Sequence, residues 1–179
     1  MVLQRKENSS FETVKPWISS IIVLPFILFF IYNEGKFNFL DYINLLIHEG
    51  GHGVFSFFGK FIYTLGGTLM QLIIPGMFVV YYLIAKKRIL TQVFLIWLGE
   101  SLINISVYAA DARAHKLPLL GGKKVYHDWT YLLNETGLIL YDYEVGRFFF
   151  WLGVFVFIIS FMMPLFLKEY EISKVDLKI

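Results

Sequence analysis

Five long runs of apolar residues alternate with short polar segments along this chain. The runs are Trp17–Tyr32, Phe39–Phe58, Leu65–Ala85, Leu90–Ala110 and Phe148–Leu167. Each approaches the roughly 20 residues that an α-helix needs to cross the hydrocarbon layer of a bilayer. Lipid offers the backbone no hydrogen-bond partners, so spanning runs of this kind must be helices. The pattern predicts an all-α, polytopic membrane helical bundle with about five transmembrane helices.

We expect residues 1–179 to form a single membrane domain, whose last membrane helix is residues 148–167. The longest non-apolar stretch is the connecting region 111–147. Within it, "KLPLLGGKK" (Lys116–Lys124) predicts a turn. "HDWTYLLNETG" (His127–Gly137) predicts a short helix, with its aspartate in the first turn and its last glycine just past the end.

The basic residues do not orient this bundle. The chain has 16 Lys and Arg residues. They divide almost evenly between the two membrane faces, whether the second run spans the membrane or only dips in and returns. The positive-inside rule needs a larger bias than this. The sequence therefore predicts no orientation.

Composition supports a membrane environment and narrows the possible chemistry. The chain is 57% hydrophobic and 17% charged, whereas a soluble domain has about a quarter of its residues charged. We therefore expect a multi-pass protein of the bacterial cytoplasmic membrane, with the lipid bilayer as a partner. A net charge of +2 gives no indication of nucleic-acid binding. Without cysteine, any metal must be bound by His, Asp, Glu or Asn.

The second apolar run contains ionisable side chains, which are costly in a membrane. A charge at the bilayer centre costs about 2.5–3.5 kcal/mol on insertion scales. The polar residues of this run recur every three or four positions and therefore share one face of a helix. They are Asp41, Asn44, His48 and His52. Such a stripe is expected to face protein or water instead of lipid.

The sequence "HEGGH" within this run predicts a zinc site. His48 and His52 are one helical turn apart, about 6 Å along the axis, so both imidazoles can reach one cation. Glu49 lies beside His48 and can act on a metal-bound water without being a ligand. This is the H-E-x-x-H arrangement of zinc hydrolases, in which the glutamate is the general base. The structural alternative is a polar contact between helices.

The fourth run carries a second polar stripe, formed by Glu100, Asn104, Tyr108 and Asp111. A hydrolytic zinc site uses three protein ligands and leaves a fourth position to water. The candidates for the third ligand are Asp111, Glu100, His127 and Asp128. An interhelical hydrogen bond is an equally good interpretation of Glu100 or Asn104 taken alone.

Two amides are candidates for binding substrate. Asn104 and Gln71 could hold an extended substrate strand or the developing oxyanion. For Gln71, an interhelical hydrogen bond is the simpler interpretation. Gly66 and Gly67, just before it, predict close helix packing.

These residues resemble the site-2-type intramembrane zinc metalloprotease family. The shared core of that family is three transmembrane helices, with H-E-x-x-H in the first and an aspartate ligand in the third. The resemblance covers a core of residues 39–112, from the "HEGGH" run to the end of the fourth run. It implies that His48, His52 and Asp111 bind Zn²⁺ and that Glu49 activates water.

The chain departs from the family pattern around Asp111. The family presents its aspartate as Leu-Asp-Gly, with asparagine and proline upstream, whereas this chain reads "NISVYAADAR". Aligning the starts of the two runs places Glu100 level with the histidines and Asp111 roughly 12–15 Å nearer the membrane boundary. Glu100, His127 and Asp128 therefore stay open as alternatives.

The leading hypothesis is an intramembrane zinc-dependent endopeptidase. It would hydrolyse peptide bonds of a membrane-protein or peptide substrate with a zinc-bound water and Glu49 as general base. One alternative is a membrane metal-binding protein or a metallohydrolase of a non-peptide substrate. Another is a non-enzymatic membrane subunit. A serine mechanism is disfavoured because no Gly-x-Ser-x-Gly occurs.

Overall fold

The computed structural model describes residues 14–118 and 126–167, and this part of the chain is helical, without a strand. The predicted all-α bundle is confirmed. The predicted turn at Lys116–Lys124 extends outside the described residues. The elements in chain order are η1 (Lys15–Trp17), α2 (Ile18–Asn33), α3 (Phe39–Val54), η2 (Ser56–Phe58), α4 (Gly59–Ile84), α5 (Arg88–Ala110), α6 (Asp128–Glu135), η4 (Ile139–Tyr141), α7 (Asp142–Phe161) and α8 (Met163–Phe166).

Four helical segments of the described chain are long and apolar enough to cross a membrane. They are Lys15–Asn33, Ser56–Ile84, Arg88–Ala110 and Ile139–Phe161. The second apolar run falls short of that length, because its helix α3 has 16 residues. The chain leaves the helix after Val54, turns through η2, and enters α4 at Gly59, where φ is +82°. The helix α3 is therefore an additional element beside four candidate spans.

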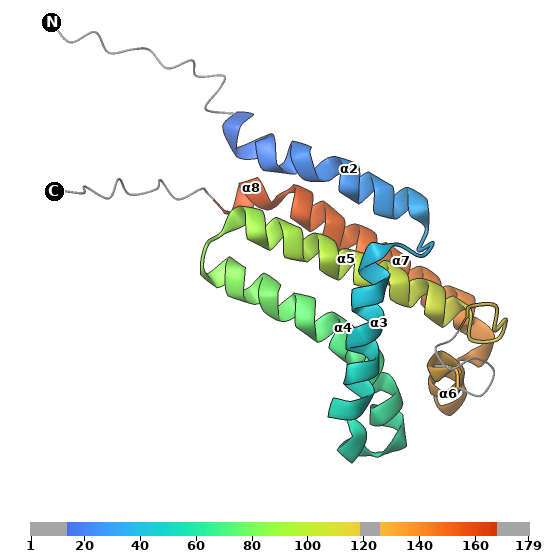
Figure 1. The fold of residues 1–179 in the computed structure, drawn as a ribbon. Coiled ribbons are helices and arrows are strands. Elements are labelled where there is room, and N and C mark those ends of the chain that lie inside the picture. The colour runs from blue at the N-terminus through green and yellow to red at the C-terminus, as the bar shows by residue number, and fades with distance from the viewer. Residues whose placement is uncertain (1–13, 119–125, 168–179) are drawn as a thin grey trace, which may run out of the picture.

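Helix α5 lies at the centre of the bundle and packs against α2, α4 and α7 (Figure 1). Glycines let α5 and α7 approach closely, since a Cβ at Gly99 would lie 2.5 Å from the ring of Phe157. Gln92 of α5 donates to Ser20 of α2 over 2.9 Å. Close packing and interhelical hydrogen bonds of this kind hold helices together in lipid.

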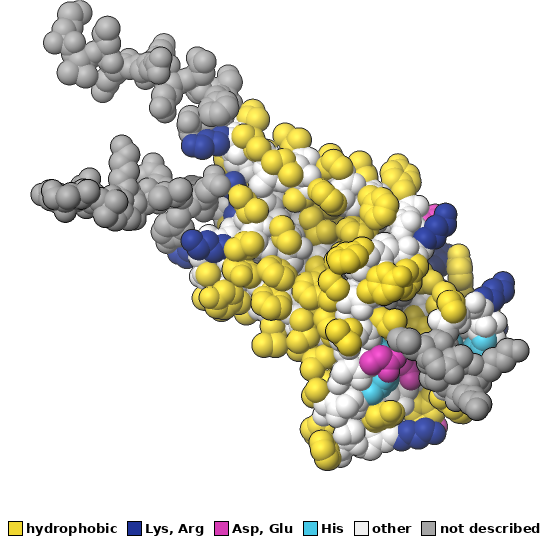
Figure 2. Space-filling model, in the orientation of Figure 1, with side chains coloured by type: hydrophobic (Ala, Val, Ile, Leu, Met, Phe, Trp, Pro, Cys, Tyr) yellow, Lys and Arg dark blue, Asp and Glu magenta, His cyan; other side chains and the backbone are white. Residues whose placement is uncertain are grey.

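Apolar side chains cover the middle of the visible face of the bundle, and charged side chains gather toward its two ends (Figure 2). The start of α2 and the end of α7 lie at one end (Figure 1). The opposite end carries the α2–α3 connection and α6. We call these the terminal end and the site end.

Helix α3 runs obliquely to the other long helices at the site end and packs along the first turns of α4 (Figure 1). Its polar residues Asp41, Asn44 and His48 are buried, which confirms the inward orientation of most of the predicted stripe. Its apolar residues Phe39 and Leu46 are each 76% exposed. Helix α3 thus buries polar side chains and exposes several apolar ones, the arrangement expected of a helix beside lipid.

Candidate metal centre

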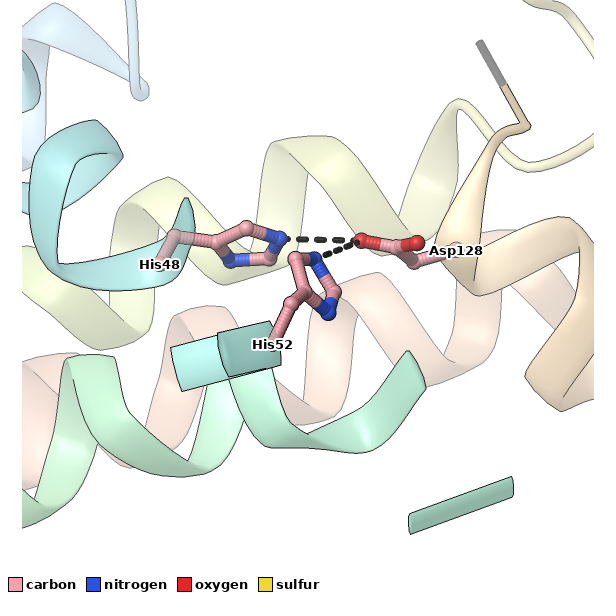
Figure 3. A group of neighbouring side chains, drawn as sticks. All are labelled: His48, His52 and Asp128. Carbon is pink, nitrogen blue, oxygen red and sulfur yellow. Dashed lines mark hydrogen bonds and ion pairs between the residues drawn. The ribbon is translucent and has the colours of Figure 1, made fainter. Parts of the chain in front are cut away.

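Two histidines of α3 and one aspartate of α6 meet at a single point (Figure 3). The Nε2 atom of His48 lies 2.9 Å from Oδ2 of Asp128, and Nε2 of His52 lies 3.2 Å from the same oxygen. One ligand atom from each of the three residues lies within 4.8 Å of the other two. This His48–His52–Asp128 group, which we call the triad, could hold a metal ion.

The triad suits zinc in donor type and in spacing. Zinc binds histidine nitrogen and carboxylate oxygen at about 2.0–2.2 Å, so two ligand atoms of a tetrahedral site are about 3.3 Å apart. The two nitrogen–oxygen separations of 2.9 and 3.2 Å are close to that value. Two imidazoles and one carboxylate are three ligands, which leaves a fourth position for water or substrate.

Hydrogen bonds at the outer nitrogens direct both imidazoles toward this point. The Nδ1 atom of His48 lies 3.3 Å from Oε1 of Gln71, and Nδ1 of His52 lies 2.9 Å from the carbonyl oxygen of Tyr63. Both partners are acceptors, so each Nδ1 carries a hydrogen. Each Nε2 is then the nitrogen available to a metal, as is usual for ligating histidines.

A chain of hydrogen bonds continues from His48 to a carboxylate. Gln71 donates from Nε2 to Oδ1 of Asn104 over 2.7 Å, and Asn104 donates from Nδ2 to Oδ1 of Asp41 over 2.5 Å. Because Asp41 accepts at one end, the orientation of both amides is set, and the oxygen of Gln71 faces His48. The two predicted substrate-binding residues thus lie at the site, with their amide groups engaged in holding a histidine.

The triad aspartate is charged near neutral pH. Burial alone would raise the pKa of Asp128, but hydrogen bonds to His48 and His52 outweigh burial and lower the pKa to about 2. An ionised carboxylate is the form that binds a metal. Asp128 therefore needs no proton loss before it can serve as a ligand.

The predicted general base lies beside the triad on a shared cavity. Glu49 is exposed, and it lines a cavity of about 670 Å³ together with His48, His52 and Asp128. The walls of this cavity come from the α2–α3 connection, α3, the first half of α4, the end of α5 and the start of α6. Glu49 can therefore reach a molecule that occupies the cavity next to the triad.

Asp111, the aspartate that the family resemblance implies as a ligand, lies elsewhere. Its carboxylate accepts the backbone N–H groups of Lys116 over 2.8 Å and Leu117 over 2.9 Å. It also lies 3.6 Å from Nε2 of His127, whose Nδ1 accepts the N–H of Thr130 at the start of α6. The structure brings Asp128 to the histidines, while Asp111 and His127 hold the segment that carries Asp128.

Glu100 makes an interhelical contact away from the triad. It is 2% exposed, and its two oxygens accept from Asn38 over 3.0 Å and from Asn44 over 2.6 Å. This arrangement matches the alternative interpretation, in which Glu100 forms an interhelical hydrogen bond. Its carboxylate is not part of the metal-binding group of the described residues.

Two further residues shape the site without having been assigned a role there from the sequence. The hydroxyl of Tyr108 accepts the backbone N–H of Asp128 over 3.2 Å, which fixes the start of α6. A Cβ at Gly67 would lie 2.5 Å from Nε2 of His48, so the imidazole lies directly on the α4 backbone. The sequence predicted close packing at Gly66 and Gly67, and the packing partner of Gly67 is the His48 ring of the triad.

Comparisons of the chain with protein-family models, with curated proteins and with solved structures found no match. Function is therefore inferred from the residues of the site and from their geometry.

Proposed function

We propose that this chain is a membrane-embedded, zinc-dependent endopeptidase in which His48, His52 and Asp128 hold the zinc. The observation that carries the proposal is the approach of both Nε2 atoms to one oxygen of Asp128, at 2.9 and 3.2 Å. Glu49 on the same cavity supplies the general base that an H-E-x-x-H hydrolase needs. Asp128 takes the ligand position that the family resemblance gives to Asp111.

A zinc ion in the triad would polarise the scissile carbonyl and lower the pKa of a water in the open position. Glu49 would accept a proton from this water as its oxygen bonds to the carbonyl carbon. The same glutamic acid would then give the proton to the amine nitrogen as the C–N bond breaks. Gln71 and the backbone of Tyr63 would keep the two imidazoles in place throughout.

The size and lining of the cavity support a polypeptide substrate. A volume of about 670 Å³ is enough for several residues of an extended chain. Apolar and aromatic side chains line it beside the triad, including Phe37, Leu45 and Val107. A substrate segment with apolar side chains would bury them there while its backbone lies next to Glu49.

Glu49→Gln tests the chemistry directly, because it removes the proton acceptor and leaves all three ligands. Newly formed N-termini of membrane proteins can be mapped by mass spectrometry in cells that express each variant. We expect Glu49→Gln to keep zinc and to reduce the wild-type cleavages by at least about 100-fold. The exposed Glu135→Gln, at the end of α6, is the matched control and should cleave like wild type. Undiminished cleavage by Glu49→Gln would contradict the mechanism.

A further inference from the structure

The cavity that holds the triad is built from the α2–α3 connection, α3, the first half of α4, the end of α5 and the start of α6. Helices α3 and α6, which carry the triad, are not themselves among those spans. Glu34 and Lys36 line the cavity from the connection after α2, and Tyr108 lines it from the last turn of α5. Leu117 and Pro118, beyond the end of α5, complete the wall. The site therefore lies at the site end of the bundle.

Contacts with α5 give the depth of the site. His48 contacts Gln71, which contacts Asn104, and Asn104 is six residues before the end of α5. Six helical residues rise about 9 Å, whereas the 23 residues of α5 rise about 35 Å. Tyr108, which contacts the backbone of Asp128, is about 3 Å from that end. The triad thus lies level with the last quarter of α5 and beside the first half of α4, where Gly67 and Gln71 meet His48.

Polar and charged groups gather at this depth, as they do at the boundary of a membrane. Lys60 lines the cavity, and its Nζ lies 4.3 Å from the ring centre of Tyr131 and 5.5 Å from that of Tyr126. Lysines whose stems follow aromatic rings are typical of the interface between lipid and water. Figure 2 shows acidic and histidine side chains close together at this end, with apolar side chains around them.

The exposed face of α3 explains how the site stays attached to the membrane at this level. Tyr42 and Leu46 are 65% and 76% exposed on its outer face, while the residues that face inward are polar. A helix with an apolar outer face that lies across the end of a bundle can rest in the interfacial layer of a bilayer. Helix α3 would then face lipid on one side and the cavity on the other.

We propose that the site acts at the rim of the membrane, on the face opposite the terminal end, and reaches water directly from that face. Its substrates are polypeptides whose scissile bond lies beside the end of a membrane span, not at the middle of one. This inference rests on the proposed function and adds its substrate class. A segment that flanks a span can enter in extended form, so cleavage does not require a helix to unwind deep in lipid.

Removal of zinc from one side of a vesicle tests the depth and the face together. The chain has no cysteine, so single cysteines report orientation without background. Glu135→Cys, outside the cavity at the end of α6, marks the site end, Lys87→Cys marks the terminal end, and Phe26→Cys lies at mid-span on the exposed face of α2. Zinc-loaded protein is sealed in vesicles of phosphatidylcholine and phosphatidylglycerol, and a membrane-impermeant maleimide and EDTA are added outside.

We expect the fraction of zinc lost to EDTA to equal the fraction of Glu135→Cys labelled from outside, with Phe26→Cys unlabelled. The inference would be overturned if zinc were released only after detergent is added. It would also be overturned if the fraction of zinc released equalled the fraction of Lys87→Cys labelled. A wild-type chain that takes up no zinc would instead overturn the proposed function. The two failures are therefore distinguishable.

The positions of the cleavages test the substrate class. Among new N-termini that require Glu49, we expect cuts within about two helical turns, roughly seven residues, of the end of a substrate span. These cuts should lie on the membrane face that Glu135→Cys identifies. Glu49-dependent cuts at the centres of spans would overturn the inference even if zinc and proteolysis are both confirmed.

Discussion

His48 and Asp128 are 80 residues apart in the chain, yet Nε2 of His48 lies 2.9 Å from Oδ2 of Asp128. This contact joins α3 to α6 and completes, with His52, a group of three residues that could hold a metal ion. Gln71 holds the outer nitrogen of His48, and Tyr108 holds the backbone of Asp128. The site therefore depends on four helices, α3, α4, α5 and α6.

Replacement of Gln71 tests whether the amide chain positions His48. Gln71→Leu removes the acceptor of the Nδ1–H group, so the imidazole loses its fixed orientation. We expect zinc affinity to fall by about 10- to 100-fold, which is typical for loss of such a partner. Competition with a chromophoric chelator measures this affinity.

Gln71→Glu is the matched control, because its carboxylate can still accept from Nδ1 of His48. We expect it to restore most of the affinity that Gln71→Leu loses. Wild-type affinity in Gln71→Leu would show that the amide does not position the ligand.

Gly67→Ala tests the packing of the His48 ring. The added Cβ would lie 2.5 Å from Nε2 of His48 and 2.6 Å from two other atoms of the ring. The ring must therefore leave its position in the triad. We expect a loss of zinc affinity of roughly 10-fold or more, as for other displaced ligands. At Gly50, two residues before His52, a Cβ would meet nothing within 4 Å. Gly50→Ala should therefore bind zinc like wild type, and equal behaviour of the two variants would contradict the account.

Much of this architecture could be predicted from the sequence, because apolar length and helical spacing are local properties. Four of the five apolar runs became helices of spanning length, and the predicted helix beginning near Asp128 became α6. The stripe that runs from Asp41 to His48 is buried. The second apolar run reaches the length of a membrane span only because it includes the apolar residues of η2. Its helix ends earlier, at Val54.

The third ligand could not be chosen from local patterns. Asp128 was one of four candidates, and the sequence gives no periodic signal for a contact across 80 residues. Asp111 matched the order of the family core, but its carboxylate is occupied by the backbone of Lys116 and Leu117. Only the return of the chain after α5 decides which aspartate meets the histidines.

Zinc binding should depend on pH through His52. Its hydrogen bond to Asp128 raises the pKa of His52 above its ordinary value, because the carboxylate favours the protonated ring. A protonated Nε2 cannot bind zinc, so affinity should fall as pH decreases through this raised pKa. Asp128, with a pKa of about 2, stays ionised throughout that range.

Calorimetry in two buffers of different ionisation enthalpy measures the protons released when zinc binds. We expect net proton release at neutral pH and weaker binding at roughly pH 6 than at roughly pH 8. An affinity that does not change between these pH values, with no proton release, would contradict the assignment of His52 as a ligand.

The most direct test of the central claim is metal analysis of the detergent-purified protein, with wild type beside Asp128→Ala and Asp111→Ala. Both variants lose one carboxylate, but only Asp128 is within reach of His48 and His52. We predict one zinc ion per chain in wild type, retention of zinc in Asp111→Ala, and its loss in Asp128→Ala. Zinc retained by Asp128→Ala and lost from Asp111→Ala, or absent from wild type, would contradict the account.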